Sequence, residues 1–129
     1  MTRWFRLLLA IAALVSIAAT SAQGPDVDRL MRKKLVCAQK ILEAVVTSRW
    51  SNLGAETRAM EMLTDDPAWH ALTAPEYAHY SSAFRKTLRD LHDAAEQRDL
   101  DAAPKAYAAM TLACVECHRY LARSRIAGR

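Results

Sequence analysis

Near the end of the chain, the stretch CVECH places two cysteines and a histidine within five consecutive positions. Cys114 and Cys117 are two of the chain's three cysteines, and His118 directly follows the second of them. Thiols and an imidazole at this spacing can serve three chemistries: covalent attachment of haem, a redox dithiol, or half of a zinc site. The compartment of the protein and the element that carries the motif discriminate among them.

The first 22 residues have the three-part layout of a secretory signal. Two arginines give a positive start, and an apolar run follows over residues 7–19. Thr20 and Ala22 then supply small side chains at the −3 and −1 positions of a cleavage site. The run is shorter than the roughly 20 residues of a membrane-spanning helix, although an uncleaved anchor is an alternative. We therefore expect a signal peptide over residues 1–22 and an exported, periplasmic protein without stable membrane insertion after signal removal.

The remaining residues, 23–129, have the length of one compact domain. The formal net charge of +4 includes the two arginines of the signal, so the exported chain is only mildly basic. Its basic residues are spread along the sequence instead of forming a cluster. Both observations argue against nucleic acid as a partner.

Four amphipathic segments predict an all-α fold. Helix-forming residues dominate, and there are only three glycines and four prolines. Apolar residues recur with the helical period, and no segment alternates for long enough to form a strand. We expect helices over residues 27–49, 51–64, 73–98 and 101–125. Short connections favour an antiparallel four-helix bundle, and the longest connection, residues 65–74, has room for a helical turn around Trp69.

The apolar stripes of these segments give an expected core. Its members are Leu30, Leu35, Ala38, Ile41, Leu42, Val45, Val46, Leu53, Met60, Met62, Leu63, Tyr77, Tyr80, Phe84, Leu88, Leu91 and Met110. Thr73 is the expected N-cap of the third helix. Pro75 then falls in its first turn, and Glu76 completes a capping box.

The cysteine motif lies within the fourth expected helix. Cys114, Cys117, His118 and Leu121 stand at i, i+3, i+4 and i+7, so they share one helix face. This grouping suits haem, because two thiols can add to two vinyl groups while the imidazole reaches the iron. A redox dithiol normally lies at a helix N-terminus. A zinc site needs four ligands, and although Cys37 could be recruited, the chain has no second spaced pair.

An exported four-helix chain whose only C-x-x-C-H lies in the last helix resembles the class II c-type cytochromes, the cytochrome c′ family. The resemblance implies one haem c, bound through thioethers to Cys114 and Cys117, with His118 as the proximal iron ligand. It also implies that the distal residue comes from the first helix and is often Met or Leu. A homodimer is a further expectation from this resemblance.

The residue on the distal side of the iron decides between two functions. The first expected helix offers Leu30, Met31 and Leu35, and Met31 is the expected ligand if the iron has a sixth one. A methionine bound to the iron suits electron transfer. If Met31 instead only fills the core, the distal face is apolar and the iron stays open to NO or CO. We expect an electron carrier that serves redox partner proteins and is not an enzyme, with a five-coordinate gas-binding haemoprotein as the alternative.

Other chemically capable residues are expected to have structural roles. Cys37 is expected to be a small buried hydrophobe. The cations Arg32, Lys33 and Lys34 are expected to form a solvated face, although one of them could pair with a haem propionate. Surface or hydrogen-bonded positions are expected for His70, His79 and His92, and packing roles for Tyr77, Tyr80 and Phe84.

Overall fold

The computed structural model describes residues 24–127, which form helices and connections without a strand. The α-helices are α2 (Gly24–Val46), α3 (Trp50–Leu63), α4 (Pro75–Gln97) and α5 (Ala102–Ala127). A short 3-10 helix, η1 (Pro67–His70), lies in the connection between α3 and α4, where room for a helical turn was expected. The expected export signal, residues 1–22, lies outside the described residues.

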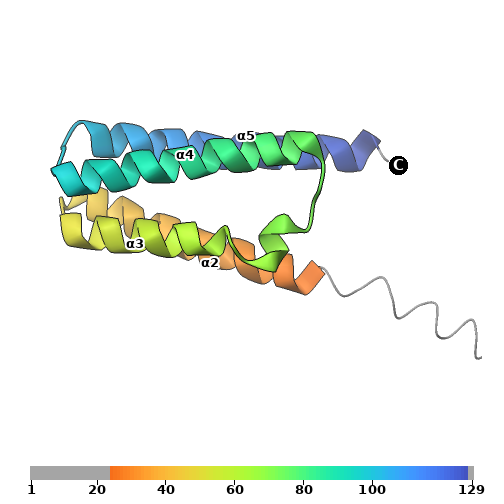
Figure 1. Ribbon diagram of the computed structural model, residues 1–129, viewed down its shortest axis with the longest axis horizontal. Helices are drawn as coiled ribbons and strands as arrows, with labels where there is room; N and C mark the ends of the chain where they lie inside the picture. Colours follow the sequence, from red (N-terminus) through yellow and green to blue (C-terminus); the bar gives the residue numbers. More distant parts are fainter. Residues whose placement is uncertain (1–23, 128–129) are drawn as a thin grey trace, which may run out of the picture.

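The four α-helices form a bundle, as expected from their amphipathic patterns. Each helix packs against the next, and α5 closes back on α2. Figure 1 shows two antiparallel pairs, α2 with α3 and α4 with α5, and the connection with η1 crossing one end of the bundle. The contact between α2 and α5 is the sparsest of the four. None of the helices within residues 24–127 combines the length and the apolar character needed to cross a bilayer.

Two left-handed residues and one carboxylate set the ends of the helices. Ser48 and Arg98 both have a φ of 53°, which ends α2 and α4 just before them. The Asp99 carboxylate accepts hydrogen bonds from the backbone N–H groups of Ala102 and Asp101, both at 2.8 Å, and these bonds lower the pKa of Asp99. Because Ser48 is left-handed, the first helix ends at Val46 and not at the expected residue 49.

The expected cap of α4 is wrong. The N-cap is Ala74 instead of Thr73, and no side chain makes a capping bond there. Ala74 is extended, with φ −63° and ψ 137°, because proline disfavours helical backbone in the residue before it. Pro75 then takes the first turn, where its missing N–H costs nothing, and the capping box with Glu76 is not formed.

The core agrees with the expected stripes in α3 and α4 but not throughout α2. All four helices contribute to it, with Leu30, Ile41, Leu53, Met60, Phe84, Leu88, Leu91 and Met110 buried. Leu35, Leu42 and Val46 are exposed, as is Met62. In α2 the buried face runs through Leu30, Ile41 and Ala44. Ile41 follows Leu30 by 11 positions and Ala44 follows it by 14, so all three share one helix face. Met31, Cys37, Ala38 and Val45 are partly buried beside this face, whereas Leu35, Val36, Leu42 and Val46 point outward.

Three buried threonines differ in how their hydroxyl groups are satisfied. Thr64 and Thr87 donate to the backbone carbonyl oxygens of Glu61 and Phe84 at 2.7 Å. The Thr57 hydroxyl is buried in α3 and has no hydrogen-bond partner among the described residues. A buried hydroxyl without a partner costs about 1–3 kcal/mol.

We predict that Thr57→Val raises the free energy of unfolding by about 1 kcal/mol, because it replaces an unpartnered hydroxyl by a methyl group. Thr87→Val is the matched control and should lower that free energy, since its hydroxyl is hydrogen-bonded. Urea unfolding followed by circular dichroism measures both changes. Equal destabilisation by the two substitutions would contradict the prediction.

Candidate functional site

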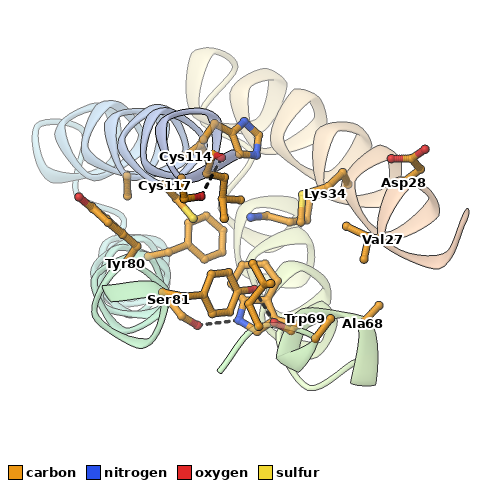
Figure 2. Close-up of a pocket in the computed structure, with 18 residues that line it drawn as sticks. Val27, Asp28, Lys34, Ala68, Trp69, Tyr80, Ser81, Cys114 and Cys117 are labelled. Atoms are coloured by element: carbon orange, nitrogen blue, oxygen red, sulfur yellow. Dashed lines mark hydrogen bonds between the residues drawn. The ribbon is translucent and has the colours of Figure 1, made fainter. Parts of the chain in front are cut away.

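A cavity of about 350 Å³ lies at the sparsely packed seam between α2 and α5. Helix α4 and the connection with η1 complete its walls, and α3 contributes none of the lining residues. Its volume is within the range of small-molecule and cofactor sites, about 300–1,000 Å³. Figure 2 shows side chains from all these elements converging on one space, and most of them are apolar or aromatic.

The α5 wall of the cavity carries the cysteine motif. Cys114, Cys117, His118 and Leu121 all line the cavity, which confirms that they share one helix face. The two cysteines are half-buried, and His118 lies at the exposed rim. Both cysteines are free thiols in this structure, as is Cys37.

The α2 wall decides among the three distal candidates. Met31 lines the cavity on the side contributed by α2, together with Val27. Leu30 is buried in the core and Leu35 is 60% exposed, and neither lines the cavity. Met31 is therefore the one of the three whose side chain reaches the space in front of the cysteine motif. That it binds iron stays a prediction.

One end of the cavity is closed by Trp69, which was not expected in the site. Trp69 is 4% exposed and packs against Phe84, with ring centroids 5.4 Å apart. Its indole N–H donates to the Ser81 hydroxyl at 2.6 Å, and the Tyr77 hydroxyl donates to its carbonyl oxygen. These bonds hold η1 on α4. Tyr77, Tyr80 and Phe84 pack in the bundle as expected, and they also line the cavity.

Lys34 was expected on a solvated face, with pairing to a haem propionate as the alternative, and it lines the cavity. Its Nζ lies 4.2 Å from the ring centroid of Trp69 and 4.0 Å from that of Phe84, within cation–π distance. Burial lowers the pKa of Lys34, and charge on Cys114 and Cys117 opposes that shift. Its position was visible in the sequence, because it follows the buried Leu30 by four residues.

The other two cations of the expected solvated face, Arg32 and Lys33, are exposed. The expectation of a solvated face is therefore confirmed for them and wrong for Lys34. The three other histidines occupy the positions expected of them, whereas Cys37 is less buried than expected. Cys37 is half-buried against the core, His70 and His79 are exposed, and His92 contacts Glu96 at 3.3 Å.

Burial controls the protonation of the motif. It raises the pKa of the Cys114 and Cys117 thiols, and the Lys34 cation only partly offsets this. Burial also lowers the pKa of His118, and Lys34 lowers it further. Protonated thiols and a neutral imidazole are therefore favoured at neutral pH.

The two alternatives to haem fit these residues poorly. A redox dithiol depends on a lowered thiol pKa, usually at a helix N-terminus, whereas these thiols lie within α5 and their pKa values are raised. A zinc site needs four ligands. Cys37 does not line the cavity, and residues 24–127 contain no group of three or more His, Cys, Asp or Glu side chains placed to bind a metal ion.

The same residues fit a covalently bound haem. Two thiols and an imidazole on one wall are the donors that C-x-x-C-H attachment uses. The other walls present the apolar and aromatic surface that a flat macrocycle requires, and a thioether, Met31, lies across the cavity on α2. Comparisons with known proteins found no matching family model, no similar curated protein and no similar solved structure.

The wall formed by Trp69 leads to a prediction about stability. Tyr77→Phe removes the donor to the Trp69 carbonyl oxygen and should lower the free energy of unfolding by about 0.5–1.5 kcal/mol. Tyr107→Phe is the matched control, because this half-buried hydroxyl has no partner among the described residues. Urea unfolding measures both. A loss no larger than that of the control would show that the bond does not hold η1.

Proposed function

We propose that this chain is an exported c-type cytochrome that binds one haem c covalently and transfers single electrons in the periplasm. The observation that carries the proposal is the convergence of Cys114, Cys117 and His118 on one cavity with apolar and aromatic walls. When bound, the haem supplies a one-electron iron couple. The protein contributes attachment, ligation and a low-dielectric surrounding.

The roles of the α5 residues follow from their chemistry. Cys114 and Cys117 would hold the ring as thioethers, and His118 would bind the iron from the same helix. Because the three lie within little more than one turn of α5, the helix itself fixes their relative positions. Covalent attachment to a rigid element keeps the cofactor in place through repeated electron exchange.

The other walls separate the cofactor from water. Trp69 and Phe84 form an apolar surface that is held on α4 by the hydrogen bonds of Trp69. Met31 lies on α2 and would supply a sixth ligand. His118 and Ser124 are exposed at the rim of the cavity. A redox partner protein would approach this rim, where the path to the cofactor is shortest.

Covalent attachment is tested by removing the thiols. We predict that Cys114→Ala/Cys117→Ala, produced in a host competent in cytochrome assembly, lacks the mass of one haem that the unchanged protein carries. Mass spectrometry under denaturing conditions and the visible absorption spectrum provide the measurements. Cys37→Ala is the matched control and should keep the haem, because Cys37 does not line the cavity. An unchanged protein that is colourless and has the mass of the bare polypeptide would refute the proposed function.

The sixth ligand is tested by replacing Met31. We predict that the oxidised holoprotein shows the absorption of a methionine–iron bond, that Met31→Leu removes it, and that the same change lowers the reduction potential. Visible spectroscopy and potentiometry measure these effects. A five-coordinate, high-spin spectrum of the unchanged protein that responds promptly to CO would instead favour the gas-binding alternative.

A further inference from the structure

The Lys34 cation lies inside the cavity without an anionic partner. Its Nζ is within cation–π distance of the Trp69 and Phe84 rings, and it has no salt bridge among the described residues. Figure 2 shows its side chain extending from α2 into the space between the cysteines and Trp69. Asp28 also lines the cavity, but no ion pair joins it to Lys34, so no described residue neutralises this positive charge directly.

Such a charge is costly to the fold. An apolar surrounding disfavours an ammonium group, and replacing a buried charge by an apolar side chain of similar volume is often neutral or stabilising. Two aromatic faces compensate only in part, because a cation–π contact is worth about 0.5–2 kcal/mol. Packing therefore gives no reason for a lysine at a position that follows the core face of α2.

The position of Lys34 indicates which part of a bound haem it would approach. Lys34, Cys114 and Cys117 line the same cavity, and Figure 2 shows the Lys34 side chain extending from α2 toward the α5 wall that carries the two cysteines. Their sulfurs would join the vinyl groups of haem, whereas the propionates belong to another edge of the ring. Lys34 would therefore lie nearer the thioether side of the cofactor than its carboxylates, and its charge would stay uncompensated.

We propose that Lys34 raises the reduction potential of the bound haem. The inference rests on the proposed function and concerns the reduction of iron(III) to iron(II) by one electron from a redox partner protein, with no proton transferred. Oxidation adds one positive charge to the cofactor, and a fixed cation nearby opposes that charge. The repulsion is strong because the cavity walls are apolar and the effective dielectric constant is low. Lys34 therefore stabilises the reduced state whether or not Met31 binds the iron.

The test compares the midpoint potentials of the holoprotein and its variants. Lys34→Met removes the charge at similar volume and should shift the equilibrium with a given one-electron donor toward the oxidised protein by about tenfold or more. That factor corresponds to a fall of about 59 mV for one electron. Lys34→Arg keeps the positive charge, so its potential should differ from that of the unchanged protein by only a small part of that shift. Lys33→Met is the matched control, because the neighbouring Lys33 is exposed.

Three measurements accompany the potentials. The mass of the unchanged protein is taken first: absence of haem refutes the proposed function itself, and this inference with it. With haem present, a shift for Lys34→Met no larger than that for Lys33→Met overturns the inference alone. Altered coordination in the resting spectrum of Lys34→Gln also overturns it, because Lys34 would then be an iron ligand; glutamine is used for this measurement because an introduced methionine could itself bind the iron. If Lys34→Met does not accumulate as holoprotein, or if its methionine binds the iron, Lys34→Gln provides the same comparison of potentials.

Discussion

The helical pitch of α5 is the constraint on which the site depends. With 3.6 residues per turn, positions 114, 117 and 118 must lie on one face, and the burial of Ala113 and Met110 fixes how that face is rotated toward the bundle. The relative positions of the two thiols and the imidazole therefore depend on neither a loop nor a segment distant in the sequence. The rest of the molecule only has to leave space in front of this face.

That space exists because the bundle is unevenly packed. Three of the four contacts between neighbouring helices are extensive, whereas α2 and α5 touch sparsely. The connection with η1 crosses the end of the bundle, as Figure 1 shows, and places Trp69 against Phe84. A four-helix bundle with closely packed neighbours throughout would bury these stripes without a cavity. The length of the α3–α4 connection thus has a function, because it carries a wall of the site.

The sequence specified the parts of the fold that depend on local periodicity. A fixed helical period predicts the four helices, the buried positions of α4 such as Tyr77, Phe84 and Leu91, and the shared face of Cys114 to Leu121. Trp69 could not be placed in the site in this way, because its position depends on where a connection folds back. The expected cap at Thr73 failed because the effect of Pro75 on its neighbour outweighed a favourable capping side chain.

Lys34 shows that a run of cations on α2 does not form one solvated face. Three cations in a row predict a solvated face over residues 32–34, but a helix turns by about 100° per residue and separates them. Two of them face water, and the third follows the direction of Leu30 and Ile41 into the interior. When a charged residue falls between core positions, its place in the helical period predicts its burial better than the composition of its neighbours does. A cation at such a position reduces the stability of the fold, and packing does not explain it, which agrees with the proposal that Lys34 acts on a bound haem.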